Sequence, residues 1–121
     1  MLDELRDHII SYLSQNRVCV ITTTGSQGAW ATVARYDNNG LELNCRLPRW
    51  SDTIYHLEND PRTIVIITNA KSVESSWLEL RGTAHITEIL DDRYVTVRIT
   101  PNRIDLIDES RGWGSRETLE L

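Results

Sequence analysis

The stretch RLPRWSDTIYHLENDPR, residues 46–62, contains the end of one predicted strand and a complete short helix. Ser51 is suited to cap the start of this helix, because a serine side-chain oxygen accepts a hydrogen bond from a free backbone N–H of the first turn. Ile54 and Leu57 form the apolar face of the helix. The Asp-Pro pair at 60–61 ends it, because the residue before a proline disfavours helical backbone. The pattern predicts a helix of about two to three turns between two strands.

The segments before this helix predict three strands. Residues 17–24 (RVCVITTT) are β-branched and apolar on both faces, which is typical of a strand that is covered on both sides. The sequence GSQG at 25–28 turns the chain into AWATVARY at 29–36. A tight hairpin to LELNCR at 41–46 follows, because the Asn-Gly pair within residues 37–40 accepts the positive φ angles of a short turn.

The segments after the helix predict further strands. Residues 62–68 (RTIVIIT) read as another buried strand, and residues 76–89 show the clearest alternation in the chain. One face of this second strand is expected to be core, and it carries Leu78, Leu80, Gly82, Ala84 and Ile86. The other face is expected to meet solvent or a partner, and it carries Trp77, Glu79, Arg81, Thr83 and His85. The segments YVTVRIT at 94–100, with Val95, Val97 and Ile99 facing inward, and RIDLID at 103–108 bring the count to six or seven strands.

The order of the elements predicts a mainly β fold with short helices. An amphipathic helix opens the chain, with apolar residues at helical spacing: Leu2, Leu5, Ile9, Tyr12 and Leu13. A parallel sheet requires a crossover, usually a helix, between successive strands, and here only one short helix interrupts the strands. We therefore expect residues 1–121 to form a single domain, a six- to seven-stranded antiparallel closed or split β-barrel. A chain of 121 residues is also near the size at which a shared dimer interface helps stability.

The charge and the cysteine content exclude several classes of partner. The net charge of −5 repels a phosphodiester backbone and an anionic bilayer alike, so neither nucleic acid nor membrane is expected as a partner. No apolar run approaches the roughly 20 residues that span a bilayer. Cys19 and Cys45 both lie within apolar runs, and the acidic N-terminus lacks the pattern of a signal peptide. We therefore expect a cytoplasmic, reduced protein.

Familiar catalytic and metal-binding motifs are absent from the sequence. It contains no GxSxG, no glycine-rich phosphate loop, no HExxH and no CxxC, so hydrolase, kinase and zinc-site interpretations are poor. His8, His56 and His85 lie far apart, and none has a second ligand at metal-binding spacing, so no metal site is expected. Cys45 shares the apolar face of its strand with Leu41 and reads as a core thiol rather than a nucleophile.

The start of the short helix is the best candidate for a binding site. A helix N-terminus offers unpaired backbone N–H groups and the positive end of a dipole, so it stabilises an anion such as a terminal phosphate. Arg35, on the neighbouring strand of the hairpin, can converge on the same place. The other candidate ligands are Arg46, Arg49, Ser51 and Thr53. The alternative is a cluster of solvated arginines without a ligand.

The aromatic residues point to a surface with a role in binding. The chain has four tryptophans and no phenylalanine. Trp77 falls on the polar face of its strand, Trp50 lies beside the helix cap, and Trp113 stands between two glycines in a polar tail. Large aromatic side chains outside the core are typical of an interface or of a site for a flat ligand. Dimer packing alone remains the alternative to ring stacking.

Three segments carry a resemblance to a known family. They are SDTIYHLENDPRT at 51–63, WLELRGTAHI at 77–86 and TPNRIDLID at 100–108. Their order and spacing resemble the serine, helix and Asn/Asp-Pro-Arg run, the tryptophan strand ending in Gly-x-Ala, and the closing strand of the pyridoxamine 5′-phosphate oxidase-like family. The proteins of this family are FMN-binding split barrels.

The resemblance implies a homodimer of six-stranded split barrels with two flavin sites at the subunit interface. It implies phosphate contacts from Arg46, Arg49, Ser51 and Thr53, beside Trp50. It places Val33, Ala34 and Arg35 along the flavin ring and ribityl chain, and it suggests Trp113 and Arg116 as contributions from the partner chain.

The sequence departs from the family pattern at one position of the expected phosphate site. Thr53 stands where the family commonly has a lysine, which removes one positive charge. Arg46 or Arg49 can replace that lysine, because a guanidinium binds phosphate with good geometry. The leading hypothesis is an FMN-dependent oxidoreductase acting on a small molecule. The alternatives are a non-enzymatic flavin-, haem- or deazaflavin-binding module of the same fold, and a protein that uses its tryptophans only for dimer packing.

Overall fold

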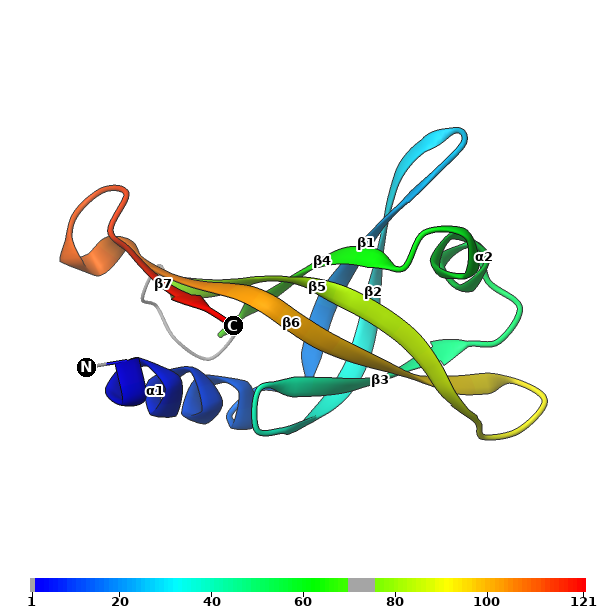
Figure 1. The fold of residues 1–121 in the computed structure, drawn as a ribbon, viewed down its shortest axis with the longest axis horizontal. Helices are drawn as coiled ribbons and strands as arrows, with labels where there is room; N and C mark the ends of the chain where they lie inside the picture. Colours follow the sequence, from blue (N-terminus) through cyan, green and yellow to red (C-terminus); the bar gives the residue numbers. More distant parts are fainter. Residues whose placement is uncertain (1, 70–75) are drawn as a thin grey trace.

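The computed structural model describes residues 2–69 and 76–121, which form seven strands, two α-helices and one short 3-10 helix (Figure 1). In chain order the elements are α1 (Leu2–Ser14), β1 (Val18–Gly25), β2 (Gly28–Asn39), β3 (Glu42–Pro48), α2 (Asp52–Asn59), β4 (Arg62–Thr68), β5 (Ser76–Ile89), β6 (Tyr94–Asp108), η1 (Glu109–Arg111) and β7 (Arg116–Glu120). The architecture is mainly β, as predicted.

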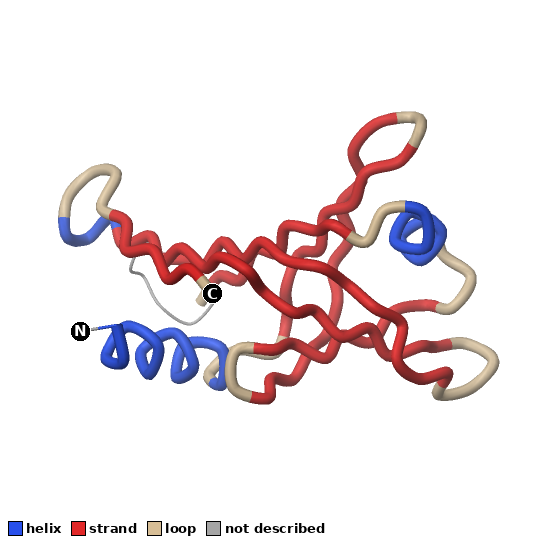
Figure 2. Tube along the Cα trace, viewed as in Figure 1, coloured by secondary structure: helices blue, strands red, loops and turns tan. Residues whose placement is uncertain are grey.

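The strands form one antiparallel sheet that closes on itself. The strand order is β3-β2-β1-β4-β5-β6-β7, and β3 also pairs with the first half of β6. Six strands therefore close a barrel, and β7 pairs with the second half of β6, outside the closure. Helices lie only at the two ends of the molecule (Figure 2). Figure 1 shows α1 and β7 at one end and α2 at the other, beside the tip of the β1–β2 hairpin.

The short helix α2 forms as the sequence predicts. The Ser51 side-chain oxygen accepts a hydrogen bond from the backbone N–H of Ile54, with an N···O distance of 3.3 Å. Asp60 is the C-cap, directly before the proline. Ile54 and Leu57 are both buried, and they fix this helix across the end of the barrel. The predicted cap, stop and apolar face are confirmed.

The predicted β2–β3 hairpin is confirmed, but its turn lies one residue further along. Asn39 still pairs with Glu42, so Gly40 and Leu41 form the turn. Gly40 has φ of +61°, while Asn39 keeps a negative φ. A single positive φ at the first turn position requires glycine only there, so the asparagines before it stay in the strand.

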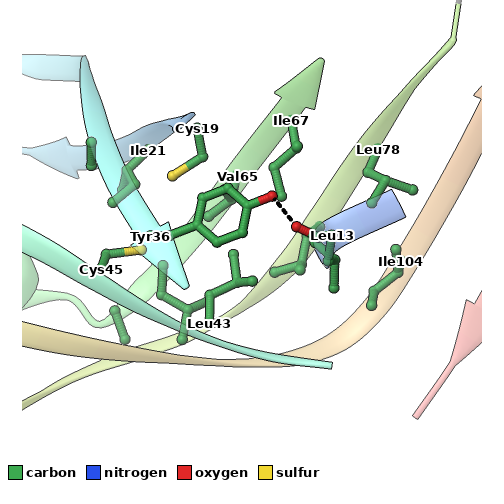
Figure 3. Packing of buried hydrophobic residues seen from close by; sticks show 14 of the residues in the cluster. Leu13, Cys19, Ile21, Tyr36, Leu43, Cys45, Val65, Ile67, Leu78 and Ile104 are labelled. Carbon is green, nitrogen blue, oxygen red and sulfur yellow. Dashed lines mark hydrogen bonds between the residues drawn. The ribbon is translucent and has the colours of Figure 1, made fainter. Parts of the chain in front are cut away.

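The barrel interior is filled by aliphatic side chains from every strand of the closure (Figure 3). Tyr36 projects into this core, and its hydroxyl donates a hydrogen bond to the carbonyl oxygen of Leu13 at 2.7 Å, which ties β2 to the end of α1. Cys19 and Cys45 are both buried free thiols. Cys45 is fully buried, as expected of a core thiol.

The expectation that residues 17–24 and 62–68 form strands covered on both faces is wrong for this chain. In β1 and β4, buried residues alternate with residues that are exposed or half-buried. Val18, Val33 and Ile64 are exposed on the outer face of the barrel. The β-branched outward residues fit a pleated strand, but no layer of the described part of the chain packs over them.

Three details of the last strands differ from the prediction. The segments 94–100 and 103–108 form one continuous strand, β6, because the sheet register shifts opposite Pro101, between Arg81 and Gly82 of β5. The strand β7 was not predicted. Ile86, expected in the core, is exposed beyond the buried part of β5, where a second register shift precedes Glu88.

Candidate functional site

Two arginines lie side by side on the outer face of the β2–β3 hairpin. Arg35 of β2 and Arg46 of β3 are cross-strand partners, and both are exposed. They line an open hollow of about 520 Å³ whose other walls are Tyr36, Asp37 and Asn44. The alternation of β2 points Ala34 into the core and leaves the neighbouring Val33 67% exposed. Arg35 therefore lies on the outer face of the barrel, together with Arg46.

The guanidinium groups of Arg46 and Arg49 lie over aromatic rings. The Cζ atom of Arg46 is 4.6 Å from the ring centroid of Tyr94, and that of Arg49 is 4.9 Å from the ring of Trp50. These distances are within the range of cation–π contacts, which orient a guanidinium while leaving its N–H edge available. The backbone N–H of Arg49 donates to the carbonyl oxygen of Arg93 at 2.7 Å, which ties the segment before α2 to the β5–β6 turn.

These arginines have no carboxylate partner among residues 2–69 and 76–121. The ion pairs of that part of the chain involve four other arginines, at positions 62, 103, 111 and 116. Arg35 and Arg46 thus give their hollow, whose wall also holds Asp37, an excess of positive charge on a chain whose net charge is −5. Such an excess attracts an anionic group.

Ser51 and Thr53 are placed differently from what the sequence suggested. The Ser51 hydroxyl donates to the carbonyl oxygen of Pro48 at 2.8 Å and accepts from Ile54 N–H, so it serves as the cap of the helix. Thr53 is 3% exposed and packs with the buried face of α2. In this structure the accessible side chains next to the helix start are therefore the half-buried Arg49, the largely exposed Trp50 and the exposed Asp52.

Trp113 and Arg116 lie at the end of the molecule opposite to α2. Trp113 is almost fully exposed in the turn between η1 and β7. Arg116 begins β7, and its guanidinium lies 3.1 Å from Asp105 and 3.8 Å from Glu79. Figure 1 shows β7 far from α2, so within one chain these residues are not brought to the arginine site. Their role as contributions from a second subunit stays a prediction.

A buried carboxylate at that end was missed by sequence reasoning. Asp105 of β6 is 0% exposed, and it accepts hydrogen bonds from the Thr118 hydroxyl and from the guanidinium of Arg103. Burial alone raises the pKa of Asp105, but these hydrogen bonds and the charges of Arg103 and Arg116 outweigh it and lower the pKa. The sequence signal that could have revealed this site was the polar face predicted for residues 76–89. Glu79 lies on that face, and in the sheet it pairs with Asp105.

The described residues also bear on metal and membrane binding. Within residues 2–69 and 76–121, no group of three or more His, Cys, Asp or Glu side chains is arranged to hold a metal ion. In the same part of the chain, no helix has the length and apolar character needed to cross a bilayer.

Solved structures share this fold, although no protein-family model matches the sequence and no curated protein is significantly similar to it. A protein related to general stress protein 26 (pyridoxinephosphate oxidase family) from Clostridium acetobutylicum has 10% identity and a TM-score of 0.81, with 98% of this chain and 96% of that chain covered. A heme binding protein from Mycobacterium smegmatis has 18% identity and a TM-score of 0.77, with 98% and 57% covered. A FAD-binding protein from Mesorhizobium loti has 13% identity and a TM-score of 0.66, with 78% and 87% covered. The chain has the split-barrel fold of the pyridoxamine 5′-phosphate oxidase-like proteins, which confirms the resemblance at the level of the fold.

Proposed function

We propose that this protein is a homodimeric FMN-binding protein that acts as a flavin-dependent oxidoreductase on a small molecule. The observation that carries the proposal is the pair Arg35 and Arg46, which are exposed and line one hollow, with Arg49 three residues further along the chain. None of the three has a carboxylate partner in the described part of the chain. The fold, which a FAD-binding protein shares, supports a flavin as the ligand.

The arginine cluster fits the phosphate end of FMN. A guanidinium offers parallel N–H donors that match two phosphate oxygens, and such charge-assisted bonds are stronger than neutral ones. The rings of Tyr94 and Trp50 lie under two of the three guanidinium groups and restrain them. In this proposal Arg46 and Arg49 take over the role of the lysine that the resemblance leads one to expect in place of Thr53.

The flat end of FMN fits the apolar outer face of the barrel. Val33 lies two residues from Arg35 on the same outer face of β2, and its cross-strand partner Val20 continues the apolar surface. In one chain the hollow beside Arg35 is open, whereas a bound cofactor has most of its surface buried. A second copy of the chain over this face would bury both the ring and the exposed valines.

When bound, a flavin supplies hydride or electron transfer. The part of this chain is to hold the phosphate with Arg46 and Arg49 and to keep water from one face of the ring with Val33. Arg35 lies between these two regions and is positioned to contact the ribityl chain.

FMN titration of the purified protein tests the proposal. We expect quenching of FMN fluorescence at micromolar protein and a dimer in sedimentation equilibrium. Riboflavin, which lacks the phosphate, should bind more weakly. Arg46→Ala should weaken FMN binding at least about tenfold, because a hydrogen bond to a charged group contributes about 1.5–3 kcal/mol. It should leave riboflavin binding unchanged.

Arg6→Ala is the matched control, because it also removes one arginine charge but from the exposed face of α1. Equal loss of FMN binding in both variants would reduce the effect to net charge and contradict a specific phosphate site. Absence of any quenching, together with a saturable shift of the Soret band of added haemin, would favour the haem-binding alternative. Tight FMN binding without reduction of the bound FMN by NADH or NADPH would favour the non-enzymatic module.

A further inference from the structure

A second hollow lies on the other side of α2, between this helix and the tip of the β1–β2 hairpin. It has a volume of about 520 Å³, and its walls include Gln27, Trp30, Asp52, Tyr55 and His56. None of the arginines of the proposed phosphate site lines it. Figure 1 shows the hairpin projecting past the barrel beside α2. The walls of the hollow come from these two elements.

Aromatic rings provide the walls of this hollow. Trp30 is 48% exposed and Tyr55 is 66% exposed, and each contacts His56. The Trp30 and His56 rings are 6.0 Å apart at 79°, and the Tyr55 and His56 rings are 6.2 Å apart at 58°. Because neither pair is stacked flat, His56 does not cover the faces of both flanking rings.

The histidine at the centre is held in place from behind. His56 Nδ1 lies 3.1 Å from the Thr23 hydroxyl, in a hydrogen bond between them. Its ring also packs on Gly25 so closely that a Cβ there would lie 2.5 Å from Nε2. His56 is therefore held in one orientation, and Trp30 and Tyr55 each contact this fixed ring.

The charge in the hollow is negative. Asp52 is exposed in the first turn of α2 and is the one formally charged side chain in the wall, His56 being counted as neutral. Among residues 2–69 and 76–121, no cationic side chain pairs with it. Aromatic faces beside an unpaired carboxylate are the combination that binds a quaternary or protonated amine, through cation–π contacts and charge.

We propose that this hollow binds a small organic cation, with the apolar body of the ligand among Trp30, Tyr55 and His56 and its positive charge near Asp52. The proposal is independent of the flavin site, because it uses other residues and a ligand of opposite charge.

The test compares choline with 3,3-dimethylbutan-1-ol, which has the same shape without the charge. Binding is followed by the indole N–H signal of Trp30 in ¹H–¹⁵N spectra, assigned with Trp30→Phe. We expect a saturable shift with choline, with a Kd of about 1–10 mM, and at least about fivefold weaker binding of the neutral analogue, as one exposed cation–π contact and one ion pair imply.

Two variants and one control decide the outcome. Asp52→Asn should weaken choline binding about fivefold, and Tyr55→Leu, which alters an exposed ring and leaves the core intact, about threefold. Asp7→Asn, on the exposed face of α1 at the other end of the molecule, should leave it unchanged. Equal binding of both ligands, unchanged choline binding in Asp52→Asn and Tyr55→Leu, or no saturable shift at about 50 mM choline would overturn the proposal. The proposal would also be overturned if a second copy of the chain protected the Trp30 indole from fluorescence quenching by acrylamide.

Discussion

Asp105→Asn removes the charge from a carboxylate that the barrel buries completely, and its cost in stability can be worked from the contacts. The carboxylate accepts from Thr118 and Arg103, and the guanidinium of Arg116 lies 3.1 Å away. Hydrogen bonds to charged groups contribute about 1.5–3 kcal/mol each, but both arginine side chains are more than a third exposed and can turn toward water after the change. We therefore expect the free energy of unfolding to fall by about 2 kcal/mol, toward the lower end of what losing these bonds implies.

Urea unfolding at pH 7 measures this loss, with Glu120→Gln as the matched control. Glu120 approaches the same Arg103 at 4.0 Å but is 76% exposed, so its loss should cost less than about 0.5 kcal/mol. Because the pKa of Asp105 is lowered in the folded state, its contribution is fully present above the ordinary carboxyl pKa of about 4 and is lost as the pH falls below it. The difference between wild type and Asp105→Asn should therefore shrink in acid. Equal stabilities of the two variants at pH 7 would refute the reasoning.

Three further substitutions test the core and the turns by denaturant unfolding. Tyr36→Phe should cost about 1 kcal/mol, because the carbonyl oxygen of Leu13 loses its buried donor. Burial raises the pKa of Tyr36, so above pH 10 this tyrosine ionises in the unfolded chain before it does so in the folded protein. The stability advantage of the wild type over Tyr36→Phe should therefore shrink above pH 10. A difference in stability that stays constant with pH would contradict this expectation. Gly82→Ala should cost about 2–3 kcal/mol, because a Cβ would lie 2.2 Å from the Thr100 carbonyl oxygen. Gly40→Ala should cost only about 1 kcal/mol, because an added Cβ meets no other atom there and only the positive φ is unfavourable. A larger loss of stability for Gly40→Ala than for Gly82→Ala would contradict this structure.

The local features of the fold were predictable because each depends on neighbouring residues. The Ser51 cap, the Asp60-Pro61 stop and the alternation from Leu78 to Ala84 all follow from short-range rules, and the structure bears them out. The antiparallel barrel followed from these elements, since only one helix interrupts the strands. Pairing of β3 with β6 then closes the barrel, a contact between segments about 50 residues apart that no local pattern records.

The errors arise where a distant contact overrides the local pattern. Pro101 suggested a break, but a register shift opposite Gly82 lets β6 continue through it. Strand β7 is short and polar, with one buried residue, Leu119, and it forms because β6 offers a free edge. At the candidate site, Thr53 takes the place of the lysine that is common in the family, and its side chain is buried.

The two parts of the proposed function are energetically linked through one strand. Val33 and Arg35 lie two residues apart on the outer face of β2, so a second subunit that covers Val33 also approaches the phosphate site. Within residues 2–69 and 76–121 the adjacent Arg35 and Arg46 have no carboxylate partner, and their mutual repulsion opposes any arrangement that buries them. A bound phosphate neutralises that charge and so favours the covered state. By linkage, FMN must strengthen dimerisation by the same factor by which dimerisation strengthens FMN binding. If the proposed function holds, a site that one chain leaves open binds FMN tightly only in the dimer, and the apolar surface and Arg35 therefore belong on one face.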